Sequence, residues 1–307
     1  MAGCYKLAGN IVGSVLGGDC IVIEASNVNL DANGFDVIGG GNVFGAGIHV
    51  LAHTPSGAAV SAVSILGEAN VASHVENFGT GILVDATIVS INFMILQNNM
   101  EDGIKLTNGS NTLGYNLSLG NFGNGITLVN SNGNSIGFNA AEDNAGTGIS
   151  LTHSSGNSIG QTTVAGNGVD GIDLFATSNN NRFVGDFDGP NTRYNVWVMS
   201  SSANQIVSIF FSDNAATTAD IYLGCSANFP AVATCTPQAN SNRIDSNFLG
   251  INASYGIAVD KASAGNTIFS NFPGPNSVFT LFDGNTKCGT NTWFGNSFAT
   301  ANLPCIH

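Results

Sequence analysis

Two carboxylates and one guanidinium lie close together in the sequence between residues 170 and 195. Asp170 and Asp173 are three residues apart on one expected strand, and Arg193 follows one repeat later. Carboxyl groups at this spacing are expected about 7–10 Å apart, which fits an inverting glycoside hydrolase with water between its acid and base. Arg193 is the local group that could neutralise a uronate in a polysaccharide lyase or epimerase. These three residues are the candidate catalytic groups, although acidic residues before glycine are also ordinary turn formers.

Four aromatic residues accompany these carboxylates. Tyr194, Trp197, Tyr222 and Tyr255 occupy equivalent or adjacent positions of successive repeats. An aromatic face stacks on the C–H groups of a sugar ring while carboxylates accept hydrogen bonds from its hydroxyls. The four residues are therefore the candidate substrate-binding groups. The alternative is that they are ordinary surface residues of a repeat protein.

Patterns that would hold a metal are sparse. Asp186-x-Asp188-Gly-x-Asn191 resembles a fragment of a calcium loop, but the distal Glu of an EF-hand is missing, so a plain turn competes with calcium binding. His49 lacks acidic company and is expected to be a surface or hydrogen-bond-satisfied histidine rather than a metal ligand. We predict no cofactor. Calcium bound by Asp186 and Asp188 is the minor alternative.

The six cysteines form three pairs that are local in sequence. The pairs are Cys4 with Cys20, Cys225 with Cys235, and Cys288 with Cys305. Six cysteines allow 15 connectivities, so these pairings rest on proximity alone. None has the spacing of a zinc or redox CxxC motif, and an even count favours disulfides in an oxidising compartment. We expect an exported protein that is secreted, on the cell surface or periplasmic.

Composition and charge exclude several partners. The chain carries 20 acidic and 7 basic residues, a net charge of −13, and the basic residues are scattered. Nucleic acid is not expected, because neutralising phosphates requires a basic face. A polyanionic polysaccharide would be repelled at long range, whereas a neutral glycan would not. No hydrophobic run reaches the roughly 20 residues that cross a bilayer, so no transmembrane segment is predicted.

A short internal repeat must position all of these residues. A Gly-Ile-x-(Leu/Val) motif, with two degenerate copies, recurs at intervals of 34, 22, 22, 23, 23, 24, 25 and 36 residues from Gly47 to Gly256. This period is too short for a βαβ unit of about 30 or more residues. It matches one three-sided coil of strands, in which Ile and Leu point inward. The fold class is predicted to be all-β: a right-handed parallel β-helix, with a leucine-rich repeat as the alternative. The outward x positions then form one column: His49, Leu83, Lys105, Thr127, Ser150, Asp173, Trp197, Tyr222 and Ala258.

A second series of motifs runs in phase with the first. Asn-x-(Ile/Leu/Phe/Trp) precedes the next Gly-Ile position by 14 residues in five of six cases. We expect each Asn to tolerate left-handed backbone at a sharp turn and to bond the Asn of the coils above and below. The motif starts at Asn111, Asn134, Asn157, Asn181, Asn204, Asn242, Asn266 and Asn291.

One β-helix domain is predicted over residues 1–307. Residues 1–35 would form an N-terminal cap and first coil, and residues 285–307 a C-terminal cap, because the strand edges at a solenoid's ends need cover. Residues 224–241, which hold Cys225 and Cys235, are an expected loop insertion. A second insertion is expected around residues 53–62.

The sequence resembles a known family. Residues 18–34 (GDCIVIEASNVNLDANG) and the repeated Asn-Gly-Ile-x-Leu-x-Asn-Ser-x-Gly-Asn-Ser-Ile pattern resemble exported bacterial β-helix repeat proteins of the NosD and carbohydrate-binding/sugar-hydrolase type. These proteins lie in the pectin-lyase-like superfamily, and the resemblance covers nearly the whole chain. It implies contact with carbohydrate without naming a reaction. The polygalacturonase and pectate-lyase motifs are absent, and 4 Met and 5 His are too dispersed to indicate copper.

The predicted function is that of a secreted carbohydrate-binding or carbohydrate-active β-helix. Its substrate would be a neutral or weakly charged polysaccharide or cell-surface glycan, with glycoside hydrolysis as the reaction if it is an enzyme. One alternative is a non-catalytic structural or adhesive surface protein. The second alternative is a polysaccharide lyase or epimerase.

Overall fold

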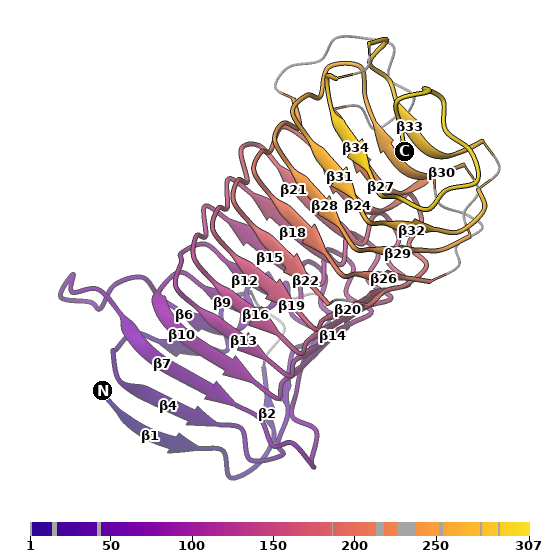
Figure 1. Cartoon of the computed structure of the whole chain (residues 1–307). Coiled ribbons are helices and arrows are strands. Elements are labelled where there is room, and N and C mark those ends of the chain that lie inside the picture. Colours follow the sequence, from indigo (N-terminus) through magenta and orange to yellow (C-terminus); the bar gives the residue numbers. More distant parts are fainter. Residues whose placement is uncertain are drawn as a thin grey trace. The chain divides into compact units, whose positions relative to one another are not determined.

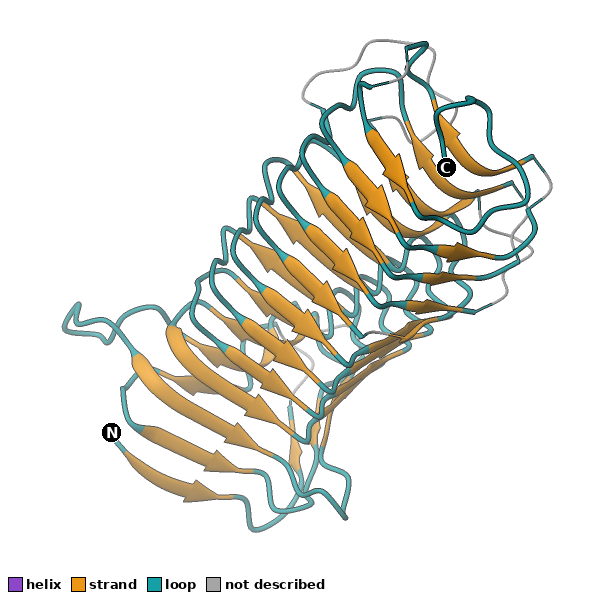
Figure 2. Ribbon diagram, viewed as in Figure 1, coloured by secondary structure: helices purple, strands orange, loops and turns teal. Residues whose placement is uncertain are grey.

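The computed structural model describes residues 2–13, 17–41, 44–185, 187–212, 218–225, 238–251, 254–276, 278–287 and 289–307. Its coils fall into two compact units, Met1–Gly148 and Ile149–His307. In the described parts of the chain every regular element is a strand (Figure 2). Each coil contributes one strand in turn to sheets A, B and C. The predicted right-handed parallel β-helix is confirmed.

In residues 1–148 the strands of successive coils lie side by side in parallel register, as β7, β10, β13 and β16 show (Figure 1). Sheet A contains β1 (Gly3–Lys6), β4 (Val28–Asp31), β7 (Ser61–Leu66), β10 (Thr87–Asn92), β13 (Thr112–Gly114) and β16 (Ser135–Gly137). Sheet B contains β2 (Ile11–Val12), β5 (Val37–Ile38), β8 (His74–Glu76), β11 (Ile95–Gln97), β14 (Leu117–Leu119) and β17 (Ala140–Glu142). Sheet C contains β3 (Ile21–Ile23), β6 (Ala46–Val50), β9 (Thr80–Val84), β12 (Ile104–Leu106) and β15 (Ile126–Val129).

Residues 149–307 repeat the same order. Sheet A contains β19 (Ser158–Gly160), β22 (Arg182–Val184), β25 (Gln205–Val207), β28 (Arg243–Asp245), β31 (Thr267–Phe269) and β34 (Thr292–Phe294). Sheet B contains β20 (Thr163–Ala165), β23 (Phe187–Asp188), β26 (Phe210–Phe211), β29 (Phe248–Leu249) and β32 (Phe272–Pro273). Sheet C contains β18 (Ile149–Thr152), β21 (Ile172–Phe175), β24 (Tyr194–Val198), β27 (Ala219–Leu223), β30 (Tyr255–Val259) and β33 (Phe279–Asp283).

The Gly-Ile-x-Leu motif forms sheet C, and its aliphatic residues build the core as predicted. Ile104 and Leu106 of β12 are fully buried, while Lys105 between them is half-buried on the outer face. Register-matched residues of neighbouring coils, such as Ile82 and Ile126 beside Ile104, continue the column. Strand alternation therefore sorts each motif into a core side and an outer side.

The Asn-x-Ile motif forms sheet A, and the predicted amide ladder is present. The Asn181 side chain donates to Asn204 Oδ1 at 3.2 Å and the Asn157 side chain to Asn181 Oδ1 at 2.9 Å. A second ladder, through Asn99, Asn121 and Asn144, lies along sheet B. All of these side chains are buried, so the ladders satisfy polar groups inside the turns.

The left-handed backbone lies one residue earlier than expected. The ladder Asn residues themselves do not have positive φ; the residue before them does in every case except Asn291, as in Ser110 (φ 62°), Gly133 (φ 68°) and Asn180 (φ 57°). The expectation that the ladder Asn takes the left-handed position is therefore wrong. The turn is made before the Asn, and the amide stays free to bond along the stack.

The insertion predicted around residues 53–62 leaves the coil as expected. His53 and Ala59 form an antiparallel bridge, and the Thr54 N–H donates to the Ala58 carbonyl at 2.7 Å. Residues 55–59 are exposed. Of the insertion predicted at residues 224–241, residues 226–237 lie outside the described parts of the chain.

The predicted Cys4–Cys20 disulfide is wrong, since both residues are free thiols. Cys4 lies on β1 of sheet A, whereas Cys20 directly precedes β3 of sheet C. A separation of 16 residues carries the chain most of the way around a coil, so closeness in sequence does not bring these two together. Cys235 and Cys288 lie outside the described residues, so the pairings with Cys225 and Cys305 stay predictions.

Across the described residues, the structure contains no helix that is both long and apolar enough to span a membrane.

Candidate functional site

The structure brings the predicted aromatic and acidic residues together on sheet C. Asp173, Trp197 and Tyr222 are register partners on β21, β24 and β27. Tyr194 and Tyr255 lie at the starts of β24 and β30 and flank the same column. The sequence thus placed these five residues correctly in one neighbourhood.

Their surroundings differ from the exposed face that the sequence suggested. Trp197 is 5% exposed and Tyr222 0%, because the rings pack on one another. The Tyr194 and Tyr222 ring centroids are 4.9 Å apart, and those of Trp197 and Tyr222 are 6.3 Å apart. Four partly buried residues pack against the outside of this cluster: Phe175, Met199, Phe279 and Phe282. The rings form a second apolar core on the outer side of the sheet.

Asp170 and Arg193 form a clamp beside this cluster. Arg193 Nε donates to Asp170 Oδ1 at 3.0 Å, and Nη2 donates to Oδ2. The Tyr194 N–H also donates to Asp170 Oδ1, at 2.9 Å. The guanidinium lies 4.4 Å from the Trp197 ring centroid. Asp170 and Asp173 are 0% and 3% exposed, so neither carboxylate faces open solvent.

A group of charged side chains that the sequence did not identify lies on sheet C of residues 1–148. We call it the charged face; it consists of Asp19, His49, Asp85, Asp102 and Lys105. His49 and Lys105 project from β6 and β12, and Leu83 of β9 is the register partner between them. Asp85 directly follows β9, and Asp102 precedes β12.

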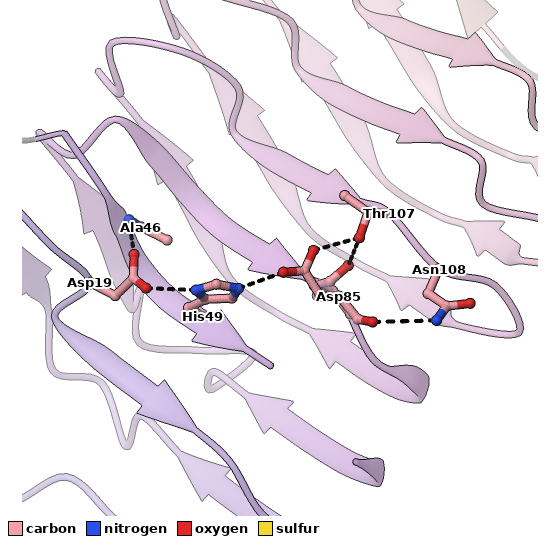
Figure 3. A network of polar contacts seen from close by, with 7 residues as sticks. Asp19, Ala46, His49, Asp85, Thr107 and Asn108 are labelled. Atoms are coloured by element: carbon pink, nitrogen blue, oxygen red, sulfur yellow. Dashed lines mark hydrogen bonds and ion pairs between the residues drawn. The ribbon is translucent and has the colours of Figure 1, made fainter. Parts of the chain in front are cut away.

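His49 bridges two of these carboxylates (Figure 3). Its Nδ1 lies 2.6 Å from Asp19 Oδ2, and its Nε2 lies 2.8 Å from Asp85 Oδ2. The expectation that His49 lacks acidic company is therefore wrong. The Asp85 bond, aided by Asp19 and opposed by burial, raises the pKa of His49. Because carboxylates only accept, the arrangement favours an imidazolium that donates from both nitrogens.

Two carboxyl groups that are both affected by the Lys105 charge have pKa values displaced in opposite directions. The His49 bond lowers the pKa of Asp85, with help from the Thr107 hydroxyl and the Lys105 charge, although burial opposes it. Burial raises the pKa of Asp102, against the opposing effect of the Asn124 N–H, which donates to Oδ1 at 2.9 Å. Asp85 thus stays ionised while Asp102 is held toward its neutral form. Pairs of carboxyls separated in this way are suited to serve as base and acid.

A signal for this face was present in the sequence. Asp19 lies three residues before Val22, and Asp85 lies two residues after Leu83. Aligning the coils by register, with Val22 beside His49 and His49 beside Leu83, brings both carboxylates to the imidazole. The motif spacing alone did not show this, because the first intervals contain the irregular coils.

The charged face is not arranged as a metal centre. Among the residues that the structure describes, no group of three or more His, Cys, Asp or Glu side chains is positioned to hold a metal ion. Of the predicted calcium ligands, Asp186 and the side chain of Asp188 lie outside the described parts.

Comparisons with known proteins agree with this architecture. The family model described as "Periplasmic copper-binding protein (NosD)" matches residues 49–187. Within the described ranges, the His, Cys, Asp and Glu side chains do not form a donor set that fits copper. No curated protein matches the chain.

Three solved structures illustrate the fold. The A-module of the Azotobacter vinelandii mannuronan C-5 epimerase AlgE6 has a TM-score of 0.71 at 18% identity, covering 98% of this chain and 81% of its own. The periplasmic alginate epimerase AlgG has a TM-score of 0.57 at 17% identity, covering 87% and 76%. The Dettilon tailspike protein has a TM-score of 0.68 at 17% identity, covering 87% of this chain, which spans only 59% of the tailspike. At these identities the likeness shows the fold alone. The predicted resemblance is thereby confirmed: the chain is a parallel β-helix repeat protein that resembles the NosD family over residues 49–187.

Proposed function

We propose that this protein is an exported polysaccharide-active β-helix that cleaves a neutral or weakly charged glycan at the charged face. The observation that carries the proposal is the pair Asp85 and Asp102, whose pKa values are displaced in opposite directions around Lys105. Asp102 would act as the acid that protonates the leaving oxygen and Asp85 as the base that activates water, roles that their displaced pKa values suit. The mannuronan and alginate epimerases with the same fold support a glycan as the ligand class.

Asp85→Asn and Asp102→Asn test this assignment. Each is expected to lower the rate of polysaccharide depolymerisation by about 10²–10⁴-fold, the usual contribution of a general acid or base. Asp143→Asn is the matched control, because Asp143 is exposed and its left-handed backbone suits Asn as well. The wild-type rate should rise with pH through the lowered pKa of Asp85 and fall through the raised pKa of Asp102, on either side of the ordinary value of 3.8.

A screen of polysaccharides with analysis of the products decides between the function classes. Cleavage that disappears in both Asn variants, but not in the control, supports the proposal. Binding without any change in the glycan would favour the adhesive alternative. A folded protein that neither binds nor changes any glycan would overturn both.

One observation favours a uronate-active lyase or epimerase as the second candidate. His49 and Lys105 place two cationic groups among the carboxylates of the charged face. Such groups can neutralise a uronate carboxylate while its ring proton is removed. Lys105→Ala should then abolish formation of unsaturated or epimerised products, whereas Lys287→Ala, at an exposed position, should not.

The residues selected from the sequence remain a second location for the site. Catalysis by Asp170, Asp173 and Arg193, with Tyr194, Trp197, Tyr222 and Tyr255 stacking the sugar, would require their packed surroundings to open. Asp173→Asn tests this with little change of shape. Loss of cleavage in this variant, with the charged-face variants unaffected, would place the reaction there.

A further inference from the structure

Three aromatic rings form a stack on the outside of residues 1–148, away from the charged face. Phe93, Tyr115 and Phe138 each follow a sheet A strand, β10, β13 and β16 respectively, at the turn into sheet B. Neighbouring centroids are 5.0 and 4.9 Å apart, with interplanar angles of 10° and 6°. Tyr115 is 54% exposed and Phe138 is 49% exposed. Large apolar surface is thus held in contact with solvent.

The turn itself does not require aromatic residues. All three have left-handed backbone, with φ of 58°, 57° and 58°. This conformation costs a non-glycine residue about 1–2 kcal/mol, and it is a genuine outlier for a bulky side chain. In residues 149–307 the positions after the corresponding strands have the same positive φ but carry small or polar residues: Gln161, Gly185, Ser208, Ser246, Ser270 and Gly295. The aromatic stack therefore has a role beyond making the turn.

The stack ends beside a cavity. Leu66 and Asn92 are register partners, so Gly67 is the neighbour of Phe93 on the preceding coil. Because glycine has no side chain, the aromatic stack ends at Phe93. A Cβ on Gly67 would lie 2.0 Å from the Phe93 carbonyl oxygen, which excludes any side chain there. Instead, the chain projects as a tight turn closed by a bridge between Glu68 and Val71. A cavity of about 310 Å³ lies between this turn and the stack.

The lining of this cavity combines apolar and polar groups in the way a sugar site does. Phe93, Tyr115, Ile95 and Leu117 supply the apolar wall, and Glu68 and Asn70 supply a carboxylate and an amide. No cationic residue is among the lining side chains that the structure describes. A ring with apolar C–H faces and hydroxyl edges fits this combination. An anionic ligand would meet the Glu68 carboxylate and a protein of net charge −13.

We propose that this cavity binds one neutral hexose unit of a glycan. The sugar ring stacks next to Phe93 on the side of Gly67, where the preceding coil contributes no aromatic side chain. The proposal rests on the proposed function for its ligand class and adds a binding site separate from the charged face. Glu68 and Asn70 hydrogen-bond the hydroxyls of the sugar, and the Phe93 ring contacts its C–H groups.

Phe93→Ser and Phe138→Ser form a matched pair of variants for the test. Serine occurs at this turn position in Ser208, Ser246 and Ser270, so both variants keep residues that the fold already uses there. Phe93 lines the cavity, and Phe138 lies at the other end of the stack. The probes are neutral hexasaccharides of β-1,4-glucose, α-1,4-glucose and β-1,4-mannose, measured by calorimetry.

At least one hexasaccharide should bind, and Phe93→Ser should weaken its binding by about fivefold to tenfold, the contribution of one aromatic contact. Phe138→Ser should change affinity by less than twofold. In Phe93→Trp the added indole should report binding by a change in fluorescence, since the native Trp197 and Trp293 are buried. Equal losses in both serine variants would show a purely structural stack and overturn the proposal. So would unchanged affinity in Phe93→Ser, or no binding of any probe.

The same variants separate this proposal from the proposed function. The wild-type protein could bind a hexasaccharide without cleaving it, and Phe93→Ser could weaken that binding. This result would support the sugar site beside Phe93 and contradict the hydrolase assignment. Cleavage that depends on Asp85 and Asp102, with the same KM in Phe93→Ser, would support the hydrolase and remove this site.

Discussion

At the scale of single residues, His49 shows how neighbours decide what a titratable group does. Both ring nitrogens face carboxylates, and the pKa of His49 is raised while that of Asp85 is lowered. The ion pair between His49 and Asp85 stabilises the fold at pH values at which His49 is protonated and Asp85 is ionised. The same contacts hold Asp85 in place for the role proposed for it.

The pH dependence of stability follows from these directions. A histidine with a raised folded pKa stabilises fully below its unfolded value of about 6.5 and loses this contribution as pH rises through the folded pKa. Asp85, with a lowered pKa, contributes above its ordinary value of 3.8 and loses its contribution as pH falls through the folded pKa. We expect His49→Gln to cost about 1 kcal/mol of unfolding free energy near pH 5–6, since the partners are partly exposed. The cost should shrink toward pH 9.

Denaturant unfolding at several pH values measures this effect. His153→Gln is the control, because His153 is exposed and has left-handed backbone of the kind that Gln161 also adopts. A cost for His49→Gln that stays constant from pH 5 to pH 9 would contradict the assignment of an imidazolium.

At the scale of elements, the amide ladders tie successive coils to one another. Asn121 donates to Asn144 Oδ1 at 2.9 Å and to the Leu96 carbonyl at 3.0 Å. Its own Oδ1 accepts the Asn99 backbone N–H at 3.1 Å. Each ladder residue therefore satisfies buried groups on two coils, and its loss affects both.

Asn121→Ala should lower the unfolding free energy by about 2–4 kcal/mol. A buried polar group left without its hydrogen bond costs about 1–3 kcal/mol, and this substitution removes the hydrogen bonds of several such groups at once. Asn29→Ala, on the exposed face of β4, should change it by less than about 0.5 kcal/mol. Thermal and denaturant unfolding of the two variants provide the comparison. Similar small losses in both would show that the ladder contributes little.

How far the elements could be predicted from the sequence depends on how locally they are specified. Ile104 and Leu106 were correctly assigned to the core because alternation along a strand is a property of the strand itself. The amide bonding of the ladder Asn residues was also predicted, since the in-phase spacing aligns them. The left-handed turn was misplaced by one residue, from Ser110 to Asn111, because both Ser and Asn are common at turns.

At the scale of the whole molecule, charge separates the two classes of polysaccharide. A net charge of −13 repels a polyanion at long range, and this repulsion is screened by salt. A neutral glycan experiences no such effect. Ionic strength is therefore a readout for the substrate class.

We expect the affinity for neutral hexasaccharides to change by less than about twofold between 0.05 and 0.5 M NaCl, because no net charge is neutralised on binding. If uronate oligomers bind, their affinity should increase with salt as the repulsion is screened. Calorimetric titrations at the two salt concentrations give both values. Uronate binding that weakens with salt would instead indicate direct pairing with Lys105 and His49.

The sequence by itself determined the parallel β-helix, its inward aliphatic columns and its Asn ladders, because these depend on a period that every coil repeats. Tertiary structure decided what the outer face does. The partners of His49 lie 30 and 36 residues away, and the burial of Trp197 and Tyr222 depends on side chains from other coils. Cys4 and Cys20 stayed apart for the same reason, since position around the coil, rather than distance along the chain, decides which side chains meet.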